Sequence, residues 1–431
     1  MLNRGSGTAS QASCTVHAAL LLCIVLLVMP RPADAQEAQL SLDDALQHPA
    51  VQQARLHVQA QADPAAERLA TLGAIPAPSG QERERAEAVR SLMVQIGLQD
   101  AHVTDINNAV GVIPGVSDSV LVFISTLDDL ATVAEHQAAA DVPPRIEGDR
   151  VVGPGTNTSS TTVAMLTAAE ALIEHAIRPH HTLVFAAVAQ EETGLAGMRA
   201  AYDQYSDRAV AFVDILGDGA TISYGALGIN WWRVEAAGPG GHTLRGGLPN
   251  VNQGIGRAVD RILQLPHPEA HADQNTHLNV AMLQSGSVFN HKPDNGWFSL
   301  DVRSLDADVI SAMEAAVDSV LHAVERETEI RFERVPKTLV PGGQIPGFRD
   351  SDVVQTSRAI AEQLGLAPNL SPAGSSNMNV AIAGGTPAIG LGGDRGGARG
   401  TPDEWASVPA LVRAAEHVLL LAATLGGLDA P

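Results

Sequence analysis

The sequence predicts an α/β protein in which a domain with a mostly parallel sheet carries an inserted α+β domain. Three observations favour this fold class. The chain has 431 residues, and a single hydrophobic core rarely grows beyond ~250–300 residues, so two domains are expected. Apolar runs of strand length alternate with helical patterns, as in parallel sheets covered by helices. Near residue 228 this pattern gives way to half-exposed strands, and it returns near residue 340.

The first part of the chain supplies the parallel-sheet pattern. Residues 62–98 have helical periodicity interrupted by a proline- and glycine-rich loop, which predicts two helices. The continuous apolar runs 120–125 and 182–189 predict buried strands, and the segment 162–176 between them predicts a helix. A strand, a helix and a strand in this order indicate parallel neighbours. A further apolar run at 209–216 predicts the next strand.

The second part of the chain predicts the inserted domain. Two alternating segments that indicate half-exposed strands are followed in each case by an amphipathic helix; the four segments are 230–237, 250–265, 298–302 and 307–325. We therefore expect residues 228–339 to form an inserted α+β domain, and residues 60–227 with 340–426 to form the α/β domain. The last part of the α/β domain is predicted to contain a helix at 352–364, a strand at 387–391 and a helix at 407–425.

The composition is that of an acidic globular protein. Apolar residues make up 45% of the chain and charged residues 17%, without a long charged block. The 27 basic and 48 acidic side chains give a formal charge of −21. Such a surface repels phosphate groups and anionic lipids, so we expect no nucleic-acid partner and no membrane association of the mature form.

The first 35 residues have the pattern of an export signal. Arg4 gives a basic start, residues 18–29 give an apolar run, and residues 33–35 give a small-x-small cleavage site. We expect cleavage near Ala35 and a periplasmic or secreted mature chain. An uncleaved transmembrane anchor is the weaker alternative, because ~20 apolar residues are needed to span a bilayer. Both cysteines of the chain fall in this segment, so the mature chain would contain no disulfide and no thiolate metal ligand.

Six segments, taken in order along the chain, resemble the motifs of one enzyme family. They are Ile124-Ser125-Thr126-Leu127-Asp128, Gln190-Glu191-Glu192-Thr193-Gly194, Gly238-Pro239-Gly240-Gly241-His242-Thr243, Asn290 with Pro293-Asp294 and Leu300-Asp301-Val302-Arg303, Ser375-Ser376-Asn377-Met378-Asn379, and Pro402-Asp403-Glu404-Trp405. By this order and spacing the chain resembles the dimerising zinc metallopeptidase family of the aminoacylases, carboxypeptidase G-type enzymes, peptidase T and succinyl-diaminopimelate desuccinylase. The resemblance implies that the inserted domain is a dimerisation (lid) domain.

The resemblance also implies the chemistry of a dinuclear zinc centre. In that family two zinc ions share a carboxylate and a water molecule, which the metals make acidic enough to attack an amide. Glu191 matches the general base, Asp128 the residue that orients the first ligand imidazole, and His242 the oxyanion-binding imidazole that acts across the dimer. Glu192 matches a zinc ligand. The resemblance further implies a homodimer that acts on a small peptide or an acylated amino acid.

Most of the zinc ligands of that family are replaced in this chain. The first ligand histidine aligns with Thr126, the bridging aspartate with Thr158, and the last ligand histidine with Gly400. A further ligand aspartate falls on Leu216 in the plainest alignment, and Asp214 or Asp218 could supply it only with a shift. Because tight zinc sites need imidazole, thiolate or carboxylate donors, we expect the zinc site to be atypical or absent.

The remaining polar motifs allow two interpretations each. Arg303, which with Asn290 corresponds to substrate-binding positions, either clamps a substrate carboxylate or forms a structural ion pair. The polar run 156–162 either caps a helix that starts after it or binds an anion through hydroxyls and amides. His136 is a conceivable substitute ligand. The glycine-rich segment 392–397 lacks the spacing of a nucleotide-binding loop and is interpreted as a cleft loop.

Two functions remain open from the sequence. The first is an exported peptidase or amidohydrolase with an atypical metal complement, in which Glu191 is the base, Glu192 a ligand and His242 the oxyanion donor. The second is a non-catalytic, metal-free dimeric binding protein on the same fold. Metal-free hydrolysis that uses Glu191 with Asp128 as an acid pair is a third possibility without further support in the sequence.

Overall fold

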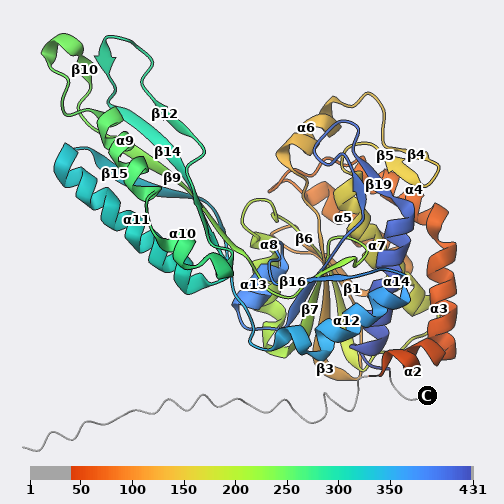
Figure 1. Ribbon diagram of the computed structural model, residues 1–431. Helices are drawn as coiled ribbons and strands as arrows, with labels where there is room; N and C mark the ends of the chain where they lie inside the picture. Colours follow the sequence, from red (N-terminus) through yellow and green to blue (C-terminus); the bar gives the residue numbers. More distant parts are fainter. Residues whose placement is uncertain (1–39, 429–431) are drawn as a thin grey trace, which may run out of the picture. The chain divides into compact units, whose positions relative to one another are not determined.

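The computed structural model describes residues 40–428 (Figure 1). The predicted export signal of residues 1–35, including both cysteines, therefore lies outside the described residues. Within the described part of the chain, no helix combines the length and the apolar character needed to cross a membrane.

A mixed sheet of eight strands forms the centre of the larger core. Its strands, in spatial order, are β1 (Gln99–Val103), β2 (Ala109–Ile113), β6 (His181–Val188), β3 (Ser117–Thr126), β7 (Ala209–Ile215), β17 (Ala388–Gly392), β8 (Thr221–Ser223) and β16 (Asn369–Ser371). The central strands β6, β3, β7 and β17 are parallel neighbours, whereas β1, β2 and β8 pair antiparallel. The predicted fold class is confirmed by this sheet.

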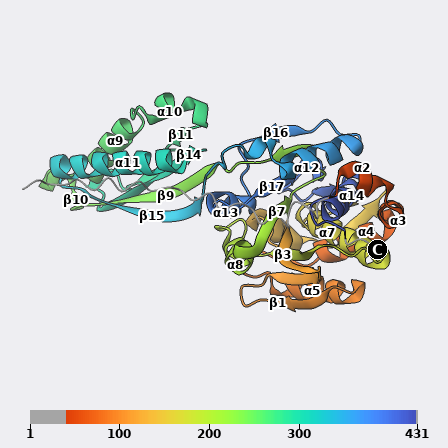
Figure 2. The same cartoon turned by 90° about the horizontal axis from the view of Figure 1, so that it is seen from below.

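Helices pack around this sheet and complete the core (Figures 1 and 2). They are α2 (Leu42–Gln47), α3 (Pro49–Ala60), α4 (Ala62–Gly73), α5 (Arg83–Ile96), α6 (Ala131–Ala139), α7 (Thr156–Glu174), α8 (Ala196–Tyr205), α12 (Asp352–Gln363), α13 (Met378–Ala383) and α14 (Val408–Thr424). Helix α7 contacts strand β3, and helices α3, α4 and α14 pack against α7. Nearly all of α7 is buried, because it lies between the sheet and this outer layer of helices.

Among the differences from the sequence expectation, two concern helices of the larger core. Helix α7 begins at Thr156, six residues before its predicted start, so the polar run 156–162 is part of the helix and does not precede it. Helix α3 was not predicted, yet its residues Val51, Ala54 and Val58 are buried in the large core. Their spacing of three and four residues is that of one helix face. The chain therefore contributes to this core before residue 60.

A second sheet, with its own core, is formed by residues between 228 and 340. Its strands are β9 (Gly228–Ala237), β11 (His277–Asn279), β12 (Leu283–Ser285), β14 (Asn295–Ser304) and β15 (Arg331–Val340), and its helices are α9 (Val251–Ile262), α10 (His267–Ala270) and α11 (Ala307–Thr328). Helices α9 and α11 lie along one face of the strands (Figure 2). The alternating burial of β14 explains why its periodicity could be recognised.

A small four-stranded sheet connects distant parts of the larger unit. In spatial order its strands are β18 (Gly396–Gly397), β19 (Trp405–Ser407), β5 (Arg150–Val152) and β4 (Arg145–Glu147). It holds the glycine-rich segment 392–400 close to the start of α7, because β5 directly precedes that helix. A two-stranded pair, β10 (Gly241–His242) with β13 (His291–Lys292), completes the strands.

Candidate functional site

The candidate site lies at the carboxyl ends of three parallel strands. Strand β3 has β6 on one side and β7 on the other, and all three run in the same direction. Ligands of open α/β sheets bind where strand order reverses in this way. A pocket of ≈ 690 Å³ opens there, and residues from the ends of β3, β6 and β7, from the start of α7 and from the segment 395–399 line it.

Asp128 anchors the loop that carries the two glutamates. Its carboxylate is fully buried and accepts hydrogen bonds from the backbone N–H groups of Glu191 (2.8 Å) and Glu192 (3.1 Å). The hydroxyl of Ser79 donates a third hydrogen bond to it (2.5 Å). Burial raises the pKa of Asp128, and these hydrogen bonds oppose the effect. Asp128 thus positions Glu191 and Glu192 without the imidazole that the family motif would place beside it.

The backbone of this loop is held in an uncommon conformation. Gln190 (φ 58°) and Leu195 (φ 62°) are both left-handed, and the N–H of Leu195 donates to the carbonyl of Gln190 (3.0 Å). The buried carboxylate of Glu82 accepts from the N–H of Gln190 (3.1 Å). Non-glycine residues with positive φ carry strain of order 1–3 kcal/mol and cluster at functional sites. The two glutamates are therefore presented by a fixed turn.

Glu191 and Glu192 both line the pocket, in different electrostatic states. Burial, together with the charges of Glu192, Asp128 and Asp214, raises the pKa of Glu191 to about 8. Glu192 instead forms an ion pair with Arg399, whose Nη2 lies 2.6 Å from Glu192 Oε1. Burial raises the pKa of Glu192, and Arg399 counteracts it. Glu192 is thus already paired with a cation from the chain itself.

The positions expected for the missing zinc ligands surround the same pocket. Thr126, Thr158 and Leu216 line it, which agrees with the plainest alignment of the aspartate position with Leu216. The side-chain amide of Asn377 donates to the hydroxyl of Thr126 (3.0 Å). Gly400 directly follows the pocket residue Arg399 and donates its N–H to Glu404 (3.0 Å). Three neutral residues thus stand at the pocket wall and a glycine stands next to it.

The start of helix α7 is occupied by Glu404 and is not a free anion site. One oxygen of its buried carboxylate accepts from the N–H groups of Gly155 (3.0 Å) and Asn157 (3.1 Å). A carboxylate at a helix N-terminus is stabilised by the exposed N–H groups and by the helix dipole. The hydroxyls of Thr156 and Ser160 donate to carbonyls three residues earlier. The hypothesis that segment 156–162 binds an external anion is therefore wrong for these groups.

Asp218 has a structural environment that differs from the one expected of a metal ligand. Its carboxylate receives two hydrogen bonds from Arg413, from Nε at 3.0 Å and from Nη2 at 2.8 Å. The N–H groups of Ala220 and Asp394 donate to its other oxygen. Asp218 does not line the pocket that contains Glu192. His136 is not among the residues that line this pocket either. We retain neither residue as a candidate ligand.

Asp214 is the other acid proposed for the shifted alignment, and it is completely buried behind the pocket. Its Oδ2 accepts from the N–H of Met378 (3.1 Å). Burial raises the pKa of Asp214 to about 6, and the hydrogen bond from the N–H of Met378 opposes this change. Asp214 lies near the end of β7 and is not among the residues that line the pocket.

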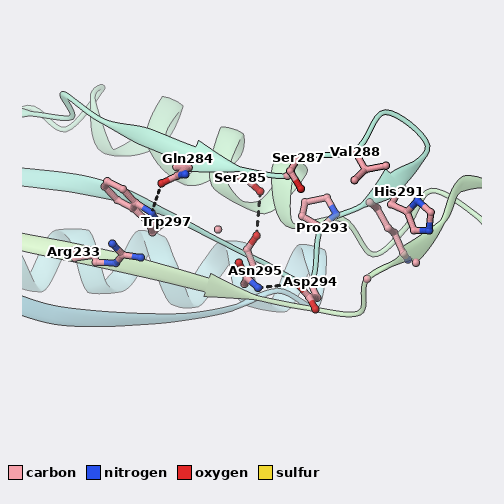
Figure 3. Close-up of a pocket in the computed structure, with 15 residues that line it drawn as sticks. Arg233, Gln284, Ser285, Ser287, Val288, His291, Pro293, Asp294, Asn295 and Trp297 are labelled. Carbon is pink, nitrogen blue, oxygen red and sulfur yellow. Dashed lines mark hydrogen bonds between the residues drawn. The ribbon is translucent and has the colours of Figure 1, made fainter.

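The structure brings His242 and Asn290 together in the inserted segment, on the β10–β13 pair. The side-chain nitrogen of Asn290 lies 3.1 Å from Nε2 of His242, and Nδ1 of His242 accepts from the N–H of Leu244 (3.1 Å). Neither residue lines the pocket around Glu191. The neighbouring residues Pro293 and Asp294 line a second pocket of ≈ 840 Å³ (Figure 3). Within the described residues, the predicted site is thus divided between two places.

Arg303 forms the structural ion pair that was one of its two interpretations. Its Nε and Nη2 atoms each lie 2.9 Å from an oxygen of Asp301, which shares strand β14 with it. The guanidinium also lies 6.0 Å from the ring centre of Trp231. Arg303 does not line either pocket. The donor atoms that could clamp a substrate carboxylate therefore bind Asp301 of the same chain.

The donor set around the pocket does not fit a dinuclear zinc centre. Two zinc ions need several imidazole, thiolate or carboxylate donors, including a shared carboxylate. Among residues 40–428 there is no group of three or more His, Cys, Asp or Glu side chains that could hold a metal ion. Thr158 offers only a neutral hydroxyl at the bridging position, and Glu192 is bound by Arg399. The zinc implied by the family resemblance therefore has no matching ligand set here.

Arg395 and Arg399 were not recognised as site residues from the sequence. Both line the pocket; Arg395 belongs to the glycine-rich segment 392–397 that was interpreted as a cleft loop, and Arg399 follows two residues after it. Burial and the nearby charge of Arg399 lower the pKa of Arg395 to about 10, and Glu191, Glu404 and Glu192 oppose this change. The sequence does contain a signal that could have indicated them. Two arginines lie four residues apart, and the second directly precedes Gly400, which aligns with a ligand histidine.

Comparisons with known proteins agree with this architecture. Residues 129–424 match the family model of peptidase family M20/M25/M40. Succinyl-diaminopimelate desuccinylase of Corynebacterium glutamicum is 25% identical over 255 residues, which cover 57% of this chain and 68% of that protein. The structure of aminopeptidase PepT from Bacillus cereus has a TM-score of 0.70 at 20% identity, covering 85% of this chain and 98% of that chain.

A further solved structure shares this fold. It is the YXEP protein of Bacillus subtilis, described as a dinuclear metal binding peptidase of the M20 family. Its TM-score is 0.62 at 15% identity, and the similarity covers 84% of this chain and 98% of that chain. By the extent of the family match and the shared fold, the chain described here belongs to peptidase family M20/M25/M40.

Proposed function

We propose that the pocket at the ends of β3, β6 and β7 binds a small peptide or an N-acylated amino acid without a dinuclear zinc centre. Membership in this family supports hydrolysis of peptide or N-acyl amide bonds as the class of activity. The observation that carries the metal-free proposal is the ion pair between Arg399 and Glu192. It places a cation of the protein on the one remaining carboxylate that matches a zinc ligand.

The chemistry of the lining residues supports binding of a peptide-like molecule. Serine and threonine hydroxyls supply hydrogen-bond donors and acceptors, and Trp231, Ile229 and Leu216 supply an apolar wall. A pocket of ≈ 690 Å³ is within the usual range for small-molecule sites. Mixed apolar walls with a few fixed polar groups are typical of such sites.

A second candidate function is metal-free hydrolysis, and the observation that favours it is that Glu191 lines the pocket beside Glu192. A glutamate with a pKa close to the working pH is suited to proton transfer. Its raised pKa leaves Glu191 mostly protonated at pH 7, however, so it is a weak base there. Without metal ions to activate water and stabilise the transition state, the barrier to amide hydrolysis is higher by several kcal/mol. Binding is therefore the function that we favour.

The decisive experiment combines metal analysis, binding and turnover on one preparation. The purified protein is dialysed against zinc, and its metal content is measured by mass spectrometry. We expect no stoichiometric zinc, calorimetric binding of N-acetylated amino acids or dipeptides in the presence of EDTA, and no turnover with added zinc, manganese or cobalt. About two zinc ions per chain would refute the proposal. Metal-free turnover that disappears in Glu191→Gln would establish the second candidate instead.

We further propose that the chain is exported and forms a homodimer. Export rests on the signal pattern of residues 1–35, and dimerisation rests on the resemblance of the inserted domain to a dimerisation domain. Sedimentation velocity of the mature chain is the direct measurement of its oligomeric state.

A further inference from the structure

The pocket contains one guanidinium that the protein leaves without a partner. Among the described residues, Arg399 pairs with Glu192, whereas the side chain of Arg395 forms no ion pair and donates no hydrogen bond. Arginine carries five N–H donors in a planar fork and remains charged at all ordinary pH values. An arginine that faces a pocket without a protein acceptor has its donors available for a ligand.

The backbone of Arg395 is fixed, so the point from which its side chain extends at the pocket wall is set before any ligand binds. Its carbonyl accepts from the N–H of Ser407 (3.1 Å). The next residue, Gly396, is in strand β18, which pairs with β19 at Ala406. Gly396 has φ 128°, and a Cβ atom there would lie 2.1 Å from the carbonyl oxygen of Trp405. Glycine is required at this position, and it lets the two strands approach and hold Arg395 at the pocket wall.

The residues around Arg395 favour a carboxylate as the group that its guanidinium binds. The remainder of the wall is neutral at the positions where the family has metal ligands, namely Thr126, Thr158 and Leu216. A carboxylate matches the guanidinium fork with two parallel hydrogen bonds. Although the chain has a net charge of −21, the unpaired guanidinium supplies a local positive charge that attracts an anion into the pocket.

We propose that Arg395 binds the free carboxylate of an N-acylated amino acid or small peptide in this pocket, beside Thr126, Thr158 and Leu216. This inference rests on the proposed binding function and adds the orientation of the ligand, whose carboxyl end points to the segment 395–399. The acyl or amino end then lies toward the apolar residues Trp231 and Ile229. Arg399 neutralises Glu192, which would otherwise repel the ligand carboxylate.

The test compares an acid probe with its neutral amide in metal-free buffer. The probes are N-acetyl-L-leucine and N-acetyl-L-leucinamide, and binding is measured by calorimetry on the full mature chain with EDTA. We expect the wild type to bind the acid more tightly than the amide. The Arg395→Gln variant should lose about tenfold to a hundredfold in affinity for the acid, as expected for a lost charge-assisted bidentate pair, with no change for the amide.

Two further variants separate recognition from folding. Arg395→Lys keeps the charge without the fork and should retain part of the affinity. Arg349→Gln, a change of an exposed arginine outside the pocket, should bind both probes like the wild type. Thermal unfolding of each variant shows whether the fold is intact, and equal losses for the acid and the amide would mean a structural role for Arg395.

The outcomes distinguish this inference from the function on which it rests. If the wild type binds the acid and Arg395→Gln binds it equally well, the assignment of Arg395 is wrong and the binding function stands. If the wild type binds neither probe without metal, or binds only after zinc is added, the metal-free function itself fails and the assignment fails with it.

Discussion

The two sides of the pocket differ in how closely they follow the pattern of the metallopeptidase family. The strand side, at the ends of β3, β6 and β7, keeps Asp128, Glu191 and Glu192 of that pattern and also holds Asp214, although Thr126 and Leu216 occupy two of its ligand positions. The loop side, which consists of residues 395–404 and the start of α7, has threonine at position 158, where the family resemblance implies the bridging aspartate. It has a glycine at position 400 and contributes two arginines to the pocket instead.

This difference shows that retained acids are not by themselves a sign of a metal site. Asp128 is satisfied by backbone N–H groups and Ser79, and Glu192 is satisfied by Arg399. A buried carboxylate is stable wherever hydrogen-bond donors or a cation replace its water. The strand side can therefore keep its acids for structural reasons while the loop side determines which ligand binds.

The largest effect is expected on the loop side, at Glu404. Its carboxylate accepts three backbone N–H groups, from Gly155, Asn157 and Gly400. Because hydrogen bonds to a charged acceptor contribute about 1.5 kcal/mol or more each, Glu404→Ala should lower the free energy of unfolding by about 4 kcal/mol. Urea unfolding followed by circular dichroism measures this change. The exposed neighbour Asp403→Asn is the control and should change it by less than about 0.5 kcal/mol. A loss below about 1 kcal/mol at Glu404 would show that the loop side does not depend on this cap.

The second largest effect is expected on the strand side, where Asp214 should make the free energy of unfolding depend on pH. The pKa of Asp214 is about 6 in the folded chain and 3.8 for a free aspartate. The unfolded chain therefore releases this proton first as pH rises, and folding is penalised progressively between about pH 3.8 and 6 and fully above that. Since each pKa unit corresponds to about 1.4 kcal/mol, the ionised carboxylate costs about 3 kcal/mol. Asp214→Asn should thus stabilise the chain by up to that amount at pH 7.5 and hardly at all below pH 4.

Unfolding free energies at the two pH values provide the measurement for Asp214. Asp207→Asn, an exposed aspartate shortly before the start of β7, is the matched control and should show no such difference between pH values. Equal effects of Asp214→Asn at pH 4 and pH 7.5 would mean that the buried carboxyl does not carry the ionisation cost.

The smallest effect concerns the contact that joins the two sides, between Glu192 and Arg399. The side chain of Arg399 is 40% exposed, so solvent screens the pair, and we expect a coupling of only about 1 kcal/mol. A double-mutant cycle of Glu192→Gln and Arg399→Gln measures it in the free energy of unfolding. The exposed helical pair Arg358 and Glu362 is the comparison, with about 0.3–0.5 kcal/mol expected. A coupling no larger than in that pair would remove the argument that Arg399 stands in for a bound cation.

The regular elements could be predicted because their information is local. The strands β3, β6 and β7 are continuous apolar runs, and periodicity of this kind is visible in a short window of sequence. Strand β15 was missed because it contains charged residues and Pro336, which are uncommon in strands. The early start of α7 was missed because its threonines and serines resemble a cap, although they are buried by layers from elsewhere in the chain.

The sequence by itself determined what is missing from the site: threonine, leucine and glycine at the ligand positions cannot supply the charged or nitrogen donors of a zinc pair. Only the tertiary structure decided what is present instead. Arg399 reaches Glu192 across 207 residues of sequence, and Glu404 reaches Gly155 across 249. Such contacts depend on the pairing of β18, β19 and β5, which brings distant segments together and leaves no periodicity in either segment. Local patterns therefore predicted the strands, and the family resemblance predicted neutral residues at ligand positions, while the arginines at the pocket became visible only when the chain was folded.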